Sequence, residues 1–245
     1  MNLFAVSRYL NRVFLLEDEM KLLTFSFDDG NEDDVRLVEI LNRYGLKGTF
    51  NLNSGKLTKT SVWKYCEKKE VRHLNYFEYP NLYEGHEIAG HSYSHPRLEQ
   101  LEQKTLDNQI RLDKKILECL YDCKIRGMAY PYGTYNQDVI DVLVENGMEY
   151  SRTIKSTYQF ELPEFPLTWH PTCHFRDKEI RQLAADFFQS SEKKDMLFYI
   201  WGHSYELVTE DDWREFEEFC EYISGRSDVY YCTNIEVLDY MAGER

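Results

Sequence analysis

The chain has 245 residues, of which 42% are hydrophobic and 29% charged, proportions typical of a soluble globular protein. Its 29 basic and 43 acidic side chains give a formal net charge of −14, and no stripe rich in Lys or Arg offsets it. This balance argues against a nucleic acid as partner, and the lack of an apolar run of about 18 residues argues against a membrane-spanning helix.

The first 19 residues hold two short apolar segments interrupted by charged side chains and followed by an acidic cluster. A secretory signal needs one longer apolar core and a small-residue cleavage site, so we expect no signal and a cytoplasmic protein. Because Met20 directly precedes the first regular strand, we interpret residues 1–19 as a dispensable extension and residues 20–245 as one domain. A helix packed on that domain is the alternative.

The six cysteines form no C-x-x-C pair, and we expect them to be reduced.

Strands and helices alternate along the chain. Hydrophobic periodicity and terminal signals predict strands at 22–27, 48–52, 87–89, 125–129, 148–153, 196–201 and 229–232, and helices at 32–44, 62–69, 101–120, 137–145, 177–189, 211–223 and 235–241. The poorly patterned stretch 54–84 is interpreted as an elaborated loop around its short helix. Alternation of this kind predicts parallel strands joined by right-handed crossovers, hence a barrel or a doubly wound sheet.

The positions of polar side chains decide between these two topologies. Such side chains follow successive predicted strands, namely Asp28 and Asp29, His91 and His95, Tyr132, Trp169 and His174, and finally His203. In a barrel the carboxyl ends of all strands converge on one face, whereas in an open sheet only those near the switch point meet. The sequence therefore predicts a single α/β domain, a (β/α) barrel.

The histidines and acids of this set suit a metal site. His91 and His95 form an H-x-x-x-H pattern, and at helical spacing their imidazoles share a face, as two ligands of one metal ion would. Of the adjacent Asp28 and Asp29, one carboxylate can bind the metal while the other acts as a base, although the pair can also be only a turn with a helix N-cap. His203, past a buried strand, can donate a proton to a leaving amine or be structural.

These residues resemble the motifs of the polysaccharide deacetylases (carbohydrate esterase family 4), which are related to the chitooligosaccharide deacetylases. The family motif T-F-D-D-G is similar to Thr24–Gly30, and its H-[ST]-x-x-H is matched by residues 91–95. Its R-x-P-Y-G is matched in part by Pro131–Gly133, and its leucine-rich strand ending in His resembles residues 196–203. The motifs come in the family's order and span residues 22–203.

The resemblance implies a distorted barrel of seven or eight strands and a metal-dependent hydrolase that removes acetyl from an N-acetylated amino sugar or short oligosaccharide. It implies that Asp29, His91 and His95 bind a divalent metal, Zn²⁺ first, with Co²⁺, Mn²⁺ or Ni²⁺ as alternatives. Asp28 would take a proton from the metal-bound water, and His203 would protonate the departing amine.

The resemblance also implies an oxyanion held by the metal and the backbone N–H of Tyr132, which follows Pro131. In the family the arginine of R-x-P-Y-G pairs with the catalytic base and orients it, whereas this chain has Ala129 at that position. Arg126 is three residues too early on the same strand. Arg152, near the end of the next predicted strand, is the candidate replacement.

A second departure concerns the family's fourth motif, an acid followed by Trp, which is not clearly present. Trp169 and His174 occupy roughly its place. Trp169 is expected either to form an aromatic wall for the sugar or to pack beneath the barrel mouth, and His174 either to contact substrate or the base or to pack. Trp201, two residues before His203, either lines the acetyl pocket or belongs to the core.

Two alternatives to sugar deacetylation stay open. One is hydrolysis of another C–N amide or ester bond on the same scaffold, and the other is a barrel that only binds carbohydrate. The expected partner is a small-molecule or oligosaccharide substrate, with neither nucleic acid nor membrane, and the sequence leaves the oligomeric state open.

Overall fold

The structure is a computed structural model, and it describes residues 19–57, 61–66 and 69–243. The predicted N-terminal extension therefore lies, apart from Glu19, outside the described residues. Within the described part of the chain, no helix combines the length and the apolar character needed to cross a membrane.

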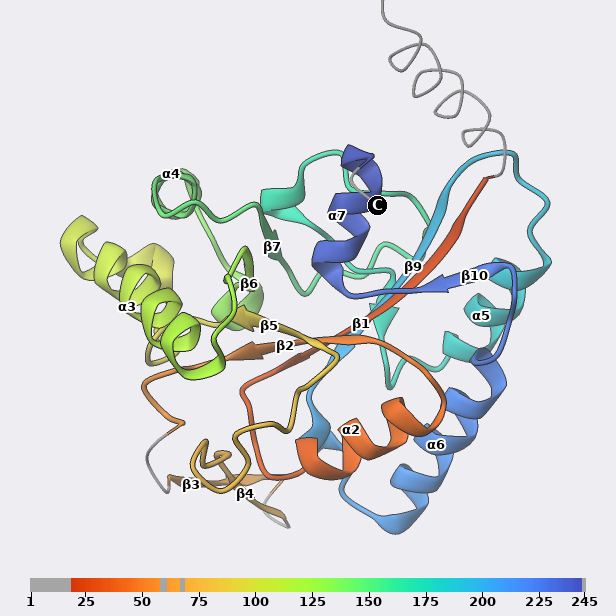
Figure 1. Ribbon diagram of the computed structural model, residues 1–245, viewed down its shortest axis with the longest axis horizontal. Coiled ribbons are helices and arrows are strands. Elements are labelled where there is room, and N and C mark those ends of the chain that lie inside the picture. The colour runs from red at the N-terminus through yellow and green to blue at the C-terminus, as the bar shows by residue number, and fades with distance from the viewer. Residues whose placement is uncertain (1–18, 58–60, 67–68, 244–245) are drawn as a thin grey trace, which may run out of the picture.

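A curled sheet of eight parallel strands forms the centre of the molecule (Figure 1). Its strands are β1 (Lys21–Asp28), β2 (Gly48–Leu52), β5 (Glu87–Gly90), β6 (Gly127–Ala129), β7 (Tyr150–Arg152), β8 (Cys173–His174), β9 (Met196–Gly202) and β10 (Val229–Tyr231). The order is β7-β6-β5-β2-β1-β9-β8, and β10 pairs with the first residues of β1, whose last residues pair with β2.

The segment around Trp169 closes the curl between β7 and β9. The N–H of Trp169 donates to the carbonyl of Ser151 in β7 (3.0 Å), and the N–H of Thr172 donates to the carbonyl of Tyr199 in β9 (2.8 Å). The structure thus confirms the predicted distorted (β/α) barrel, in the form of a curled parallel sheet with flanking helices.

Amphipathic helices cover the outside of the sheet. They are α2 (Asp34–Arg43), α3 (Gln103–Tyr121), α4 (Gln137–Glu145), α5 (Ile180–Gln189) and α6 (Glu210–Ile223), whereas α7 (Asn234–Ala242) packs at the amino-terminal end of the barrel. Helices α2 and α6 lie side by side on one flank, with α3 and α4 on another (Figure 1). Apart from the helix expected at 62–69, the predicted elements are present with ends shifted by at most three residues, and the short β8 was not predicted.

The predicted helix at 62–69 is wrong. This stretch instead forms an antiparallel hairpin of β3 (Val62–Tyr65) and β4 (Lys69–Arg72). Along β3 the exposed Val62 and Lys64 alternate with the half-buried Trp63 and Tyr65, which is the period of two of a strand with one covered face. Aromatic and β-branched residues favour such a strand, and four residues gave too short a pattern to distinguish it from a helix.

Along the second half of β1, hydrophobic side chains that face the outer helices alternate with polar side chains that face the barrel interior. Phe25 and Phe27 pack outward, where Phe27 contacts the ring of Phe216 in α6 edge-on at 6.2 Å. The alternate residues Ser26 and Asp28 are buried and hydrogen bonded within the barrel. Because side chains of a strand alternate between its faces, this arrangement carries Asp28 to the carboxyl end of the barrel interior.

A buried carboxyl group, Glu87, ties the other end of the barrel to α7. It accepts hydrogen bonds from Thr49 Oγ1 (2.7 Å), Tyr150 OH (2.8 Å) and the backbone N–H of Ile235 (2.9 Å). Burial raises the pKa of Glu87 to about 7 despite these hydrogen bonds, and the nearby Glu236 adds to the rise. The folded protein therefore holds a proton here that the unfolded chain releases near pH 4.5.

Because the folded pKa of Glu87 is raised, its contribution to stability is complete below pH 4.5 and is lost as pH rises through about 7. We expect Glu87→Gln to remove this dependence of stability on pH. The unfolding free energy of the variant, relative to that of the wild type, should therefore rise by roughly 3 kcal/mol between pH 5 and pH 8. Urea unfolding at several pH values measures this difference. The exposed Glu145→Gln in α4 is the control, and parallel curves for Glu87→Gln and wild type would refute the prediction.

Candidate active site and metal centre

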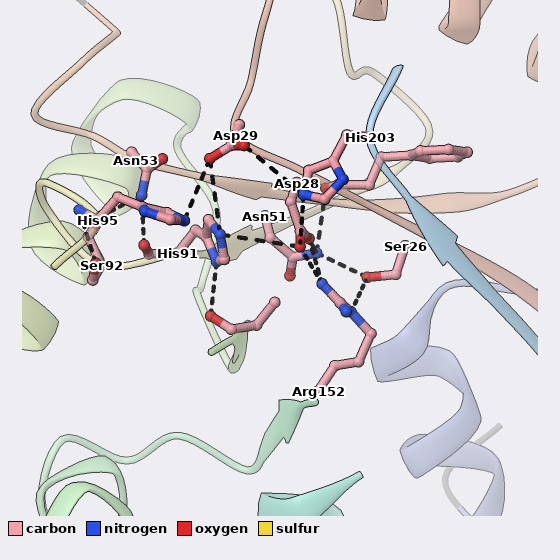
Figure 2. A network of polar contacts seen from close by, with 12 residues as sticks. Ser26, Asp28, Asp29, Asn51, Asn53, His91, Ser92, His95, Arg152 and His203 are labelled. Atoms are coloured by element: carbon pink, nitrogen blue, oxygen red, sulfur yellow. Dashed lines mark hydrogen bonds and ion pairs between the residues drawn. The ribbon is translucent and has the colours of Figure 1, made fainter. Parts of the chain in front are cut away.

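The two adjacent acids at the end of β1 both reach the same site (Figure 2). Successive side chains of a strand point to opposite faces, but Asp29 has a φ of 79°, which breaks the alternation. Its N–H donates to the carbonyl of Asn51 in β2 at 3.0 Å, so the turn is anchored to the sheet. Both carboxylates consequently lie at the carboxyl end of the barrel, where Asp28 is 2% and Asp29 is 9% exposed.

His91 and His95 meet through an irregular turn after β5, and the prediction that they share a helical face is wrong. Ser92 and His95 have φ values of 62° and 63°, and Ser92 Oγ accepts the N–H of His95 at 3.1 Å. The side-chain amide of Asn53 donates to the carbonyl of Ser92 at 2.8 Å. These contacts fold the five-residue motif so that its two imidazoles lie 4.7 Å apart.

The donor atoms of Asp29, His91 and His95 fit one metal ion. Asp29 Oδ1 lies 3.7 Å from His95 Nε2 and 3.9 Å from His91 Nε2, and the three ligand atoms lie within 4.8 Å of one another. Metal–ligand bonds of about 2.1 Å at tetrahedral angles place ligand atoms roughly 3.4 Å apart, so the two distances from Asp29 need to shorten by only about 0.3–0.5 Å.

The protonation of the two histidines also suits a metal. His91 Nδ1 lies 2.8 Å from the carbonyl oxygen of Ala129, which can only accept, so this nitrogen carries the proton and Nε2 keeps its lone pair. Burial lowers the pKa of His91 and that of His95, the latter to about 4, so both imidazoles are neutral at pH 7. A carboxylate and two neutral imidazoles form a donor set that zinc accepts.

Asp28 is paired with Arg152, a fully buried residue at the end of β7. Nη2 of Arg152 donates to both carboxylate oxygens of Asp28, at 2.5 Å to Oδ1, while its Nε donates to Ser26 Oγ at 3.2 Å (Figure 2). The amide of Asn51 adds a bond to Asp28 Oδ1 at 2.9 Å. Burial acts to raise the pKa of Asp28, but the Arg152 guanidinium outweighs it and lowers that pKa to about 2, so the carboxylate is ionised.

The register of the sheet relates Arg152 to Ala129. Strands β6 and β7 pair so that Ala129 lies directly opposite Arg152. An arginine at either position would belong to the same layer of the barrel, one strand apart. Among the described residues, Arg152 is the only charged side chain that hydrogen bonds to Asp28. It lies directly across the strand pair from Ala129, where an arginine was expected.

A third group, His203, faces both acids from the end of β9. Its Nε2 lies 3.9 Å from Asp28 Oδ2 and 3.9 Å from Asp29 Oδ2, while its Nδ1 lies 3.2 Å from Glu206 Oε1. The other oxygen of Glu206, Oε2, lies 2.9 Å from His174 Nε2, close enough for an ion pair. His174 thus lies beside Glu206 and not beside Asp28 or Asp29, and it completes a chain of polar contacts through Glu206 to His203.

The pKa shifts along this chain agree with its hydrogen bonds. Burial opposes ionisation of Glu206, but hydrogen bonds from His174 and His203 lower its pKa to about 2. Burial likewise acts against a charged His203, but the bond to Glu206 and the charges of the two aspartates raise its pKa. Sequence reasoning missed Glu206, for which the only signal was an acid three residues after His203.

The remaining predicted residues divide between the site and the core. Tyr132, 48% exposed with a φ of 60°, follows the buried Pro131, and its ring lies 4.6 Å from that of His95. Trp201 is buried and stacks on the guanidinium of Arg152 at 4.6 Å, so it packs against the charged partner of Asp28. Trp169 is 2% exposed in the barrel interior, which favours packing over an aromatic wall for a sugar.

Comparison with known proteins adds the family. The family model described as polysaccharide deacetylase matches residues 16–151, more than half of the chain. The chain belongs to the polysaccharide deacetylase family. The uncharacterized protein YlxY of Bacillus subtilis is 29% identical over 119 residues, which are 49% of this chain and 33% of that protein, so the chain spans about a third of this relative.

Solved structures of the family share the fold. The peptidoglycan deacetylase PdaC of Bacillus subtilis superposes with a TM-score of 0.57 at 17% identity, covering 91% of this chain and 93% of that chain. BA3943 of Bacillus anthracis, a pseudoenzyme of carbohydrate esterase family 4, gives 0.50 at 17% identity, covering 91% and 66%. The fold thus occurs with and without activity, and the function depends on the residues of the site.

Proposed function

We propose that this member of the polysaccharide deacetylase family is a metal-dependent hydrolase that removes the acetyl group from an N-acetylated amino sugar or short oligosaccharide. The observation that carries the proposal is the convergence of a metal-ligand set, a base and an acid at one end of the barrel. Asp28 and Asp29 both lie within 4.0 Å of His91 and of His203.

Asp29, His91 and His95 would hold the metal, with Zn²⁺ favoured by the donor set. When bound, the metal polarises the acetyl carbonyl and lowers the pKa of a water molecule toward about 7. Asp28, which is ionised and does not belong to the ligand set, accepts the proton of the attacking water. Arg152 holds both oxygens of Asp28 and so fixes the direction from which that proton is taken.

His203 supplies the second proton transfer. Attack of water forms the new C–O bond, and the C–N bond then breaks to give acetate and an amine. The amine nitrogen needs a proton to leave, and His203 Nε2 is the nitrogen that faces the reacting centre because Nδ1 is held by Glu206. The N–H of Tyr132, in its left-handed turn, remains the predicted donor to the oxyanion.

Acetate release from a panel of N-acetylated sugars tests the proposal. The protein is stripped with a chelator and assayed with added zinc, cobalt, nickel or manganese, and Asp28→Asn is the blank. We expect metal-dependent release from at least one amino sugar, while sugars acetylated only on oxygen separate amide from ester hydrolysis. Release from esters alone would favour the other hydrolase, and binding without release would favour a carbohydrate-binding barrel. Location in the cytoplasm stays a prediction.

A further inference from the structure

Tyr205, in the 3-10 helix η4 (Ser204–Glu206), contacts the metal-ligand set from a side that no motif covers. Its hydroxyl donates a hydrogen bond to Asp29 Oδ2 at 3.3 Å. The other oxygen, Oδ1, is the one nearest to the two ligand histidines, 3.7 Å from His95 Nε2 and 3.9 Å from His91 Nε2. One carboxylate oxygen of Asp29 therefore faces the metal position, and the other faces the hydroxyl of Tyr205.

The ring of Tyr205 is held on two sides. It stacks on the imidazole of His203 with centroids 4.9 Å apart. From the β3–β4 hairpin, Trp63 and Tyr65 approach it edge-on at 5.5 and 5.1 Å. A phenol with only two side-chain torsions and rings on both sides is preorganised, so its hydroxyl is directed at Asp29 at little entropic cost.

Metal ligands are commonly oriented by a hydrogen bond to the atom that does not bind the metal, and loss of such a bond typically weakens metal affinity 10–100-fold. A phenol remains a donor at neutral pH and a carboxylate oxygen can only accept, so the sense of this bond is fixed. Asp29 sits in a left-handed turn directly after the last residue of β1. Tyr205, 176 residues further along the chain, holds the carboxylate of Asp29 by this hydrogen bond.

We propose that Tyr205 is a positioning residue that holds Asp29 in a one-oxygen binding mode and thereby sets the affinity of the metal centre. The proposal rests on the proposed function only as far as the metal site of Asp29, His91 and His95. The β3–β4 hairpin also contributes to this positioning, because its Trp63 and Tyr65 pack against the ring of Tyr205.

The test is zinc affinity of Tyr205→Phe, measured on stripped protein at pH 7 by competition with a chromophoric chelator. This variant keeps the ring and its packing and removes only the hydroxyl. We expect zinc affinity to fall about 10–100-fold while the urea midpoint of the metal-free protein is unchanged. Acetate release should return toward the wild-type rate at saturating zinc. Tyr158→Phe is the matched control, because its hydroxyl also donates to a carboxylate, that of Asp177, which is no candidate ligand.

Wild-type zinc affinity in Tyr205→Phe overturns the proposal, and so does an equal loss of stability in the metal-free variant, which would mark a structural role. A wild type that binds no zinc overturns both this inference and the metal centre. A wild type that binds zinc but releases no acetate overturns only the proposed function, and the fall in affinity would then still support the role of Tyr205.

Discussion

Asp28→Asn is expected to lower the turnover number by roughly 10²–10⁴-fold, the range that a positioned general base contributes. The amide cannot take up the proton of water, yet it has nearly the shape of the carboxylate. Zinc affinity should stay close to that of the wild type, because Asp28 does not belong to the ligand set of Asp29, His91 and His95. Acetate release and chelator competition on the same preparation measure the two quantities.

Asp29→Asn is the matched comparison one residue further along the chain. It removes the charge of a proposed ligand, so zinc affinity and turnover are both expected to fall. The pair of variants assigns a base role to one acid and a ligand role to its neighbour. Turnover of Asp28→Asn above roughly a tenth of the wild-type rate would contradict the first assignment, and unchanged zinc affinity in Asp29→Asn would contradict the second.

Arg152→Met is expected to destabilise the fold by about 3–5 kcal/mol, because it leaves Asp28 buried without its charged partner. In Asp28→Asn the same replacement should cost much less, since no buried charge is then left alone. Urea unfolding of the four proteins of this double-mutant cycle measures the coupling. Equal destabilisation in both backgrounds would show that Arg152 acts through packing against Trp201 and not through Asp28.

The activity role of Arg152 is separated from stability by Arg152→Lys, which keeps the charge but not the planar fork. We expect turnover to fall about 10²-fold with little change in the Michaelis constant, because the base is misdirected rather than lost. Moving the arginine back across the strand pair, as Ala129→Arg with Arg152→Ala, should recover part of this turnover. A double variant no better than Arg152→Ala would refute the register argument.

Much of the fold followed from local patterns. Alternating strands and helices predicted the barrel because each buried strand is a short apolar run bounded by turn residues, and polar residues directly after these runs marked the site. The hairpin at Val62–Arg72 was missed because its apolar positions are few and its covered face is made by Tyr205, which is distant in sequence.

The sequence motifs predicted which residues form the site, but not how the backbone brings them together. Asp29, His91 and His95 converge, although by a left-handed turn and not by the helical spacing assumed from the sequence. Arg152 could be named as the partner of Asp28 from its place at the end of the next strand, but only the register of β6 and β7 shows why the position is equivalent.

Tyr205 and Glu206 could not be predicted in the same way. Their side chains leave η4 in directions set by tertiary packing, one toward Asp29 and the other toward His203 and His174. A run of Ser, Tyr and Glu after a histidine carries no period and no known spacing. Residues that support a site from a short irregular segment become visible only when the surrounding strands are placed.

The proposed activity requires a single metal ion held by Asp29, His91 and His95. The most direct measurement is a zinc titration of stripped protein, with acetate release from the best N-acetylated sugar followed at each addition. We expect no release of acetate without zinc, and a rate of release that rises with added zinc and saturates at one zinc per chain. Release that persists in the stripped protein, or that zinc at full occupancy fails to restore, would contradict it.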